Sequence, residues 1–259
     1  MRVFAAAALI AAATAACGGG GLFQHYEYEE DVYLSLDGAA TVYVNSSVAA
    51  LDALRGAAFD TRSSATIDRD RVRTFFSTAI TRPSRISTSR RSGRRFVHVR
   101  VDVDNIRRLG EAGPFSWSTY RFARDGDLYT YRQAIGASAR KDVGAVGWTG
   151  REIVAFRLHL PSKIAYHNAP PGNLRRGNIL VWEQSLSDRL EGVPLELETR
   201  IEMQSILYRT LWLFGATFAA VALTFVAVIW RVRRAGTRRA AAQPREPGAL
   251  EASAHGDPL

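Results

Sequence analysis

The stretch VYLSLDGAATVYV, residues 32–44, decides the fold class of this chain. Apolar side chains alternate with polar or aromatic ones on both sides of Asp37-Gly38. An Asp-Gly pair supplies the positive φ angles that a tight two-residue turn needs. Regular alternation indicates strands that bury one face. The stretch therefore predicts an antiparallel β-hairpin with one face in a hydrophobic core.

The same alternation recurs along the chain, so strands joined by hairpins are expected to dominate the fold. It predicts a second hairpin in residues 85–105, a third in 117–133, and single strands at 152–160, 178–186 and 195–203. In the last of these, four apolar side chains alternate with four charged ones. That pattern is typical of a sheet with one face in the core and the other in solvent.

Short helices are expected between the strands. Ser47 can cap a first helix that ends at Gly56, and Asp68 or Asp70 can begin a second. A third is predicted around residues 106–109. The predicted fold class is α+β: a mainly antiparallel sheet with two or three short helices, over residues 25–208, followed by a single C-terminal transmembrane helix.

Residues 210–230, TLWLFGATFAAVALTFVAVIW, contain no charged side chain. A helix of this length matches the hydrocarbon core of a bilayer, about 30 Å thick. The sequence predicts a transmembrane helix at 209–230 and a disordered basic tail at 231–259. Five arginines follow the helix directly, and the positive-inside rule places them in the cytoplasm as a basic anchor: Arg231, Arg233, Arg234, Arg238 and Arg239. The α+β domain is then extracytoplasmic.

Residues 1–16 have the features of an export signal, because a short apolar run and small residues precede Cys17. In one interpretation Cys17 becomes a lipid-modified N-terminus, as in bacterial lipoproteins, and residues 17–24 form a glycine-rich tether. Thr14 stands where leucine is usual in such signals. In the other interpretation, cleavage follows a preceding alanine and Cys17 is incidental. A single cysteine excludes an intramolecular disulfide in either case.

The net charge of +9 is concentrated at the ends of the chain, which leave only four net positive charges in the α+β domain. That balance argues against a nucleic-acid partner. Within the domain, residues 68–95 hold nine arginines and two aspartates. Near a membrane this basic segment could contact anionic lipid head groups or an anionic envelope polymer. The alternative is a solvated hairpin tip and helix face.

Residues 158–186, LHLPSKIAYHNAPPGNLRRGNILVWEQSL, resemble the LppM-like domain family of bacterial envelope proteins. The shared features are a strand that ends in proline, a segment with Asn168 and Gly172, and the sequence GNILVW. The layout of export signal, α+β domain, membrane helix and basic tail is similar too. The resemblance implies a non-enzymatic cell-envelope protein that binds envelope lipid or glycolipid. The RRSGRR hairpin has no counterpart that we can map onto the family.

The sequence contains no convincing catalytic, metal-binding or cofactor-binding pattern. Ser138 and Lys141 have a Ser-x-x-Lys spacing but lie in a Gly/Ala-rich loop without the partner motifs. His98, His159 and His167 match no metal-ligand spacing. The sequence therefore predicts a protein that is not an enzyme and that has no metal and no cofactor.

Two functions are compatible with this organisation. In the first, the domain binds a lipid ligand, with its acyl chain in an apolar groove and its head group at the hairpin arginines. The tentative ligand- or membrane-contact residues are Arg90, Arg91, Arg94, Arg95 and Trp182. For Trp182, packing on the sheet is the favoured alternative. In the second, the domain is a protein-interaction, scaffold or sensor module of an envelope complex.

Overall fold

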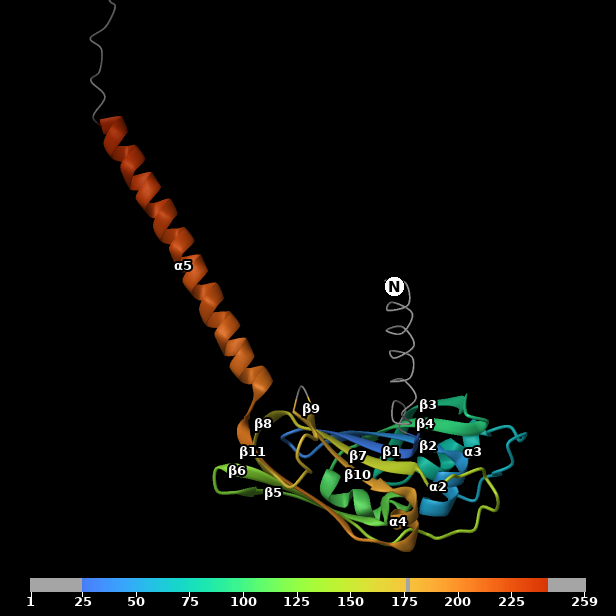
Figure 1. Cartoon of the computed structure of the whole chain (residues 1–259). Helices are drawn as coiled ribbons and strands as arrows, with labels where there is room; N and C mark the ends of the chain where they lie inside the picture. The colour runs from blue at the N-terminus through green and yellow to red at the C-terminus, as the bar shows by residue number, and fades with distance from the viewer. Residues whose placement is uncertain (1–24, 176–177, 242–259) are drawn as a thin grey trace, which may run out of the picture. The chain divides into compact units, whose positions relative to one another are not determined.

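The computed structural model describes residues 25–175 and 178–241. The chain divides after Ile206 into a folded domain and a C-terminal unit. Figure 1 shows strands from distant parts of the sequence side by side in the domain, with short helices beside them.

The first sheet has seven strands in the order β3-β4-β2-β1-β7-β10-β9. Its strands are β1 (His25–Leu34), β2 (Ala40–Ser47), β3 (Thr81–Arg91), β4 (Arg94–Val103), β7 (Glu152–His159), β9 (Leu174–Arg175) and β10 (Ile179–Ser185). The predicted hairpin around Asp37-Gly38 is confirmed as β1 and β2, with Val32 opposite Val42. The second hairpin is confirmed as β3 and β4.

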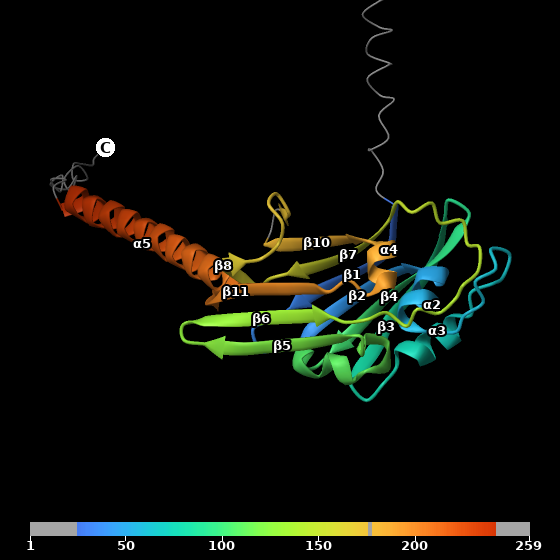
Figure 2. The same ribbon diagram turned by 60° about the horizontal axis from the view of Figure 1, so that its bottom comes forward.

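The second sheet has four strands in the order β5-β6-β11-β8, visible from below in Figure 2. They are β5 (Ser118–Asp125), β6 (Leu128–Ile135), β8 (Ser162–His167) and β11 (Leu195–Ser205). The third predicted hairpin is β5 and β6. Strand β8 lies between the predicted strands at 152–160 and 178–186, where no strand was predicted. Its backbone pairs with β11, a contact that a local pattern does not encode.

One pairing in the first sheet is parallel. β1 runs alongside β7, with His25 opposite Glu152 and Tyr33 opposite His159. The end of β11 pairs with the start of β8, where Ser205 lies opposite Ser162. The chain therefore enters the domain where β7 begins and leaves it beyond the point where β7 ends.

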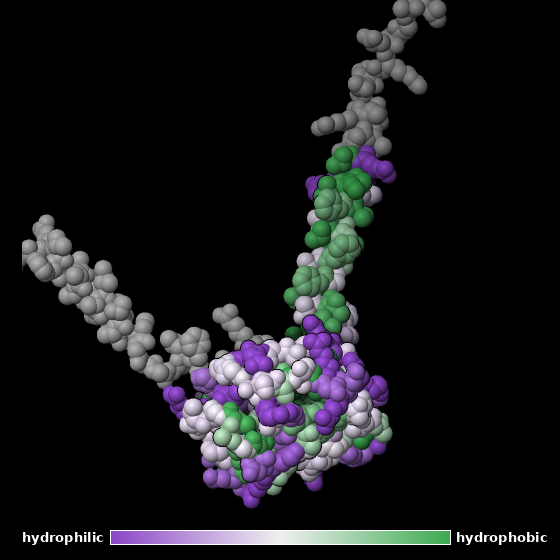
Figure 3. Space-filling view, turned by 90° about the vertical axis from the view of Figure 1, so that its right-hand side faces the viewer, coloured by the Kyte–Doolittle hydropathy of each residue, from purple (hydrophilic) through white to green (hydrophobic). Residues whose placement is uncertain are grey.

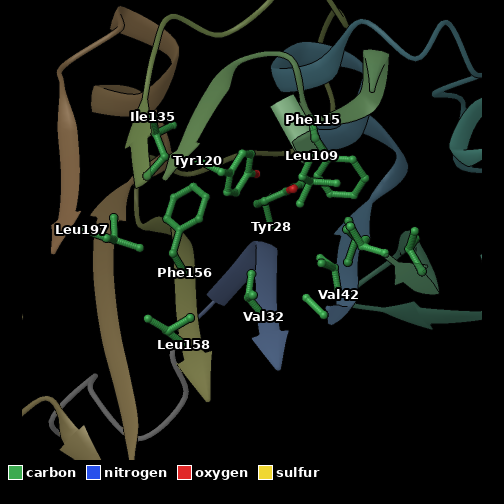
Figure 4. Packing of buried hydrophobic residues seen from close by; sticks show 14 of the residues in the cluster. Tyr28, Val32, Val42, Leu109, Phe115, Tyr120, Ile135, Phe156, Leu158 and Leu197 are labelled. Carbon is green, nitrogen blue, oxygen red and sulfur yellow. The ribbon is translucent and has the colours of Figure 1, made fainter. Parts of the chain in front are cut away.

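Both sheets contribute to one hydrophobic core. Figure 4 shows the labelled side chains of this core, among them Val32 and Phe156 from the first sheet and Ile135 and Leu197 from the second. The four alternating valines of β4, at positions 97, 99, 101 and 103, are all buried, as expected for strands with one face in the core. Because the apolar faces of both sheets are in this core, it accounts for the alternation seen along the strands.

The helices between the strands are short, and two of them begin at predicted caps. They are α2 (Val48–Arg55), α3 (Arg69–Phe76), α4 (Leu186–Glu191) and the 3-10 helices η2 (Ile106–Glu111) and η3 (Gly113–Phe115). Ser47 caps α2 and Gly56 ends it in the left-handed conformation, while Asp68 caps α3. Helix α4 was not predicted. Its first residue, Leu186, was assigned to the preceding strand, and Ser185 caps it.

Replacing Ser47 with alanine is expected to lower the free energy of unfolding by about 1 kcal/mol. The Ser47 hydroxyl accepts the Ala50 N–H at 3.0 Å in a buried setting, and alanine would leave that donor unpaired. Thermal or denaturant unfolding of the two proteins measures the difference. Ser84→Ala in β3, where the side chain is exposed, is the control and should change stability by less than about 0.5 kcal/mol.

The C-terminal unit contains one long helix, α5 (Ile206–Ala241). Residues Ile206–Arg234 are long and apolar enough to cross a membrane, by length and composition. Its large apolar side chains are exposed, as the green surface of the helix in Figure 3 shows. The helix continues beyond residue 230, so the prediction of disorder was wrong for residues 231–241. Alanine and arginine both favour helix, which explains the extension.

Candidate functional site

Two of the hairpin arginines predicted from the sequence, Arg94 and Arg95, line a cavity of about 490 Å³. It is lined by residues 47–49, 61–63 and 92–95, together with 143 and 145–147. We call this cavity the hairpin pocket. It therefore combines the first turn of α2, the turn between β3 and β4, and two loops that are far apart in the sequence.

The turn at Ser92-Gly93 sets the position of the arginines that follow it. Both turn residues have positive φ angles, 49° and 75°, as expected for a two-residue turn whose twist matches the flanking strands. Arg91 therefore lies opposite Arg94, and Arg90 opposite Arg95. Because successive side chains of a strand point to opposite faces of the sheet, Arg94 and Arg95 have different neighbours.

Arg94 is held by two carboxylates. Its guanidinium lies 2.9 Å from Glu27 and 3.7 Å from Glu152, and it donates to the Gly147 carbonyl at 2.8 Å. Burial alone would raise the pKa of Glu152, but hydrogen bonds from the Thr149 and Gly150 backbone N–H groups hold that pKa below its usual range. Arg94 thus forms part of the pocket wall, and the two glutamates fix its side chain and neutralise its charge.

Arg95 is in a different electrostatic situation. Its residue is only 7% exposed, and its guanidinium donates to the neutral carbonyl of Asp60. Burial lowers its pKa, Asp60 opposes that effect, and the like charges of Arg90 and Arg62 add to it. A buried guanidinium that contacts a carbonyl has N–H groups and positive charge to offer an anion.

Arg62 lies at the rim, and its side chain is 80% exposed. It donates to Asp60 with 2.6 Å between Nη2 and Oδ2. This bond, with that from the Arg62 backbone N–H, lowers the pKa of Asp60 to about 2. The first turn of α2, which carries the partial positive charge of a helix N-terminus, completes the lining. The pocket therefore presents two arginines and a helix end to a ligand.

The other predicted contact residues lie elsewhere. Arg90 is exposed and outside the lining. Arg91 donates to the Tyr26 carbonyl at 2.9 Å and lies over the Phe96 ring. Trp182 is 2% exposed and donates its indole N–H to the Asn168 amide oxygen at 3.1 Å. Trp182 is therefore a core side chain, which corrects its tentative assignment as a ligand contact and confirms the packing alternative.

The remaining predicted site residues belong to the ends of the chain. Cys17 and the signal lie outside the described residues. Arg231, Arg233 and Arg234 are exposed on α5, and Arg234 lies over the Trp230 ring. Arg238 and Arg239 are in the same helix, and the structure does not describe their side chains. The basic-anchor assignment stays a prediction.

Sequence reasoning missed Arg62, which lines the pocket, and Glu27 and Glu152, which pair with the lining residue Arg94. Glu27 is buried because the β1–β7 register shifts between Tyr26 and Tyr28, so two successive side chains turn inward. A bulge of this kind has no local sequence signal. The pairing of Glu152 with Arg94 and the position of Arg62 at the pocket depend on long-range packing.

A second polar cluster is fully inside the core, around Glu30. The Glu30 carboxylate pairs with Arg55 at 2.5 Å and accepts from Tyr28, Tyr120 and Gln133 at 2.9, 3.0 and 3.1 Å. Arg55 also lies 3.8 Å over the Trp117 ring. Burial raises the pKa of Tyr120 well above its usual value, and the Glu30 charge adds to this. With no solvent access, this cluster is structural.

The histidines do not gather in the structure. Within residues 25–175 and 178–241, no group of three His, Cys, Asp or Glu side chains is placed to hold a metal ion. His98 bonds to Asn45 and Ser89, and His159 stacks on Tyr33. Ser138 and Lys141 also have structural contacts, with the Leu190 carbonyl and with Asp52.

No protein-family model matches the sequence, and no curated protein matches it. Among solved structures, the chain is similar to the NMR structure of the Mycobacterium tuberculosis LppM folded domain. The identity is 11% and the TM-score 0.39, over 71% of this chain and 94% of that one. This is a weak similarity of fold. The resemblance to the LppM-like family is supported to that extent, and membership stays a prediction.

Proposed function

We propose that this chain is a membrane-anchored, extracytoplasmic binding protein of a bacterial cell envelope whose hairpin pocket binds an anionic group. The observation that carries the proposal is Arg95, a buried guanidinium on a neutral carbonyl at the wall of a cavity of about 490 Å³. The ligand chemistry is a phosphate, supplied by a lipid head group or by an anionic envelope polymer.

The chemistry of the lining supports an anion over other ligands. Arginine presents a planar fork of N–H donors that matches phosphate oxygens, and its charge acts more strongly where water is excluded. Arg94 is neutralised by Glu27 and Glu152, whereas Arg95 and the α2 end are available. A cavity of about 490 Å³ is large enough for a phosphate-bearing head group.

The lining also supports binding over catalysis. Its hydroxyl groups belong to Ser47, Thr61, Ser63 and Ser92. Histidine and carboxylate side chains, which could activate a hydroxyl as a base, do not occur among the described lining residues. The pocket has the parts for recognition and lacks the pair that nucleophilic catalysis needs.

The test uses the full-length chain in phosphatidylcholine nanodiscs, titrated calorimetrically with two soluble probes. Short-chain phosphatidylglycerol stands for a lipid head group and polyphosphate for a polymer. Arg62→Gln should weaken binding about tenfold, since it removes a charged donor and leaves Asp60 unpaired at the rim. Arg95→Lys, which keeps the charge but loses the fork, should weaken it as well.

Arg90→Gln is the matched control, because it makes the same charge change on the same hairpin outside the pocket. It should alter affinity less than about threefold. Binding of the lipid alone identifies a head group, and binding of polyphosphate alone identifies a polymer. Failure of both probes to bind, or equal losses for Arg62→Gln and Arg90→Gln, contradicts the assignment of the pocket.

A further inference from the structure

A second hollow lies at the opposite end of the first sheet from the hairpin pocket. It has a volume of about 490 Å³ and is lined by the ends of β1, β2, β4 and β7. Pro161 also lines it, and the Pro161 carbonyl accepts the N–H of Ile206, where the chain leaves the domain. We call it the ring hollow. It is a separate site, and its argument does not depend on the hairpin pocket.

One wall of the ring hollow is aromatic. The Tyr33 ring stacks on the His159 ring with their centroids 3.8 Å apart and their planes 14° from parallel. Tyr43 meets Tyr33 edge to face at 5.3 Å. Tyr33 remains 44% exposed although it has both partners. The two partners thus fix the position of the Tyr33 ring, and part of this residue remains open to solvent.

The stack is uncharged at neutral pH. Burial, with the nearby charge of Arg157, lowers the pKa of His159 below its usual value. The imidazole is therefore neutral at pH 7. Of the titratable and charged groups around it, Tyr33 on β1 stacks on the ring and Arg157 on β7 acts on it by its charge.

The lining also contains two carboxylates, Asp102 and Asp104, whose arginine partners lie outside it. Asp104 binds Arg82, with Nη1 2.8 Å from Oδ2, and Asp102 lies 3.4 Å from Arg100. The Thr41 hydroxyl donates to Asp102. Both ion pairs are largely exposed, so their outer edges retain free donor and acceptor positions. Each pair is neutral overall, which weakens the attraction of this part of the lining for a charged ligand.

We propose that the ring hollow binds the ring of an uncharged saccharide. The apolar C–H groups of a sugar ring can pack against the exposed part of Tyr33, and neighbouring hydroxyls can both donate to a carboxylate and accept from a guanidinium. A charged ligand gains nothing from neutral ion pairs, and a purely apolar ligand would desolvate four charged groups without replacing their hydrogen bonds. A polyhydroxylated ring can make an apolar contact with Tyr33 and hydrogen bonds with the ion pairs.

The test titrates the full-length chain in phosphatidylcholine nanodiscs with maltotriose, cellotriose and mannotriose. Saturation-transfer NMR detects contact with the sugar, and calorimetry gives the affinity. At least one trisaccharide should bind. Tyr33→Ala should weaken that binding at least about tenfold, the usual scale for truncating a central aromatic contact. Tyr33→Phe should keep it, and Asp102→Asn should weaken it.

Tyr166→Ala is the matched control. Tyr166 lies on β8, is 48% exposed and is outside the ring hollow, so its loss should leave sugar affinity unchanged. Circular dichroism checks that each variant is folded. The proposal is overturned if none of the three sugars binds, or if Tyr33→Phe and Tyr166→Ala reduce affinity as much as Tyr33→Ala does. The phosphate probes report separately on the hairpin pocket.

Discussion

Glu30→Ala is expected to lower the free energy of unfolding by about 3–5 kcal/mol, because it leaves the buried charge of Arg55 without its counterion. It also removes the acceptor for Tyr28, Tyr120 and Gln133. Thermal unfolding of the full-length chain in nanodiscs, followed by tryptophan fluorescence, measures the loss. Near the upper end of this range the domain would be marginally folded, since total stabilities are about 5–15 kcal/mol.

Two comparisons make this result specific to the buried pair. Glu111→Ala breaks an exposed pair with Arg108 and should lower stability far less than Glu30→Ala, because solvent screens that pair. The double variant Glu30→Leu/Arg55→Met should be more stable than Glu30→Ala alone, because no buried charge remains unpaired. A small effect of Glu30→Ala, similar to that of Glu111→Ala, would show that water reaches this cluster.

Trp182→Ala should also cost about 3–5 kcal/mol, the usual range for truncating a large buried aromatic side chain. It creates a cavity beneath β10 and leaves the Asn168 amide oxygen with the Glu198 N–H as its remaining partner. Denaturant unfolding of the two proteins measures the difference. Trp182→Phe, which keeps most of the volume, should cost distinctly less.

The same variants separate a core residue from a ligand contact. Trp182→Phe should bind phosphatidylglycerol and polyphosphate as the unaltered chain does, since Trp182 is not among the residues that line the hairpin pocket. If Trp182→Phe remained stable but lost binding, the buried placement of this indole would be wrong, and the earlier assignment as a ligand contact would stand.

Local chemistry predicts a large part of this fold. The Asp37-Gly38 hairpin, the Ser47 and Asp68 caps and the inward valines of β4 all follow from neighbouring residues. Turns and caps depend on a few consecutive residues, which explains why they could be predicted from one sequence.

The missed features depend on pairing between distant segments. The parallel contact of β1 with β7 and the pairing of β8 with β11 join residues more than thirty positions apart. Strand β8 carries polar and apolar residues without a clear period, so only its partner defines it. Helix α4 follows β10 without a gap, and its cap, Ser185, also fits the end of a strand.

The candidate site was predictable in one part only. The RRSGRR turn marked the hairpin, but the four arginines look alike in sequence, and the structure gives them different partners: Tyr26 for Arg91, two glutamates for Arg94 and a carbonyl for Arg95. The aromatic wall of the ring hollow was not predicted at all. Tyr33 and His159 meet through the parallel pairing of β1 and β7.

The opposite positions of chain entry and exit have a mechanical consequence. The seven residue steps from Glu152 to His159 span about 23 Å. Cys17 and His25 are eight steps apart, which reach at most about 28 Å when fully extended. If a lipid on Cys17 and the helix α5 are both anchored in the same bilayer, the tether of residues 17–24 limits how far the start of β1 can lie from that bilayer. With β7 perpendicular to the bilayer, the tether would have to be almost fully extended. With β7 parallel to the bilayer, it would not. Lipidation would then restrict the tilt of the domain relative to the bilayer. Without the lipid, only α5 would anchor the domain, and its tilt would not be restricted in this way.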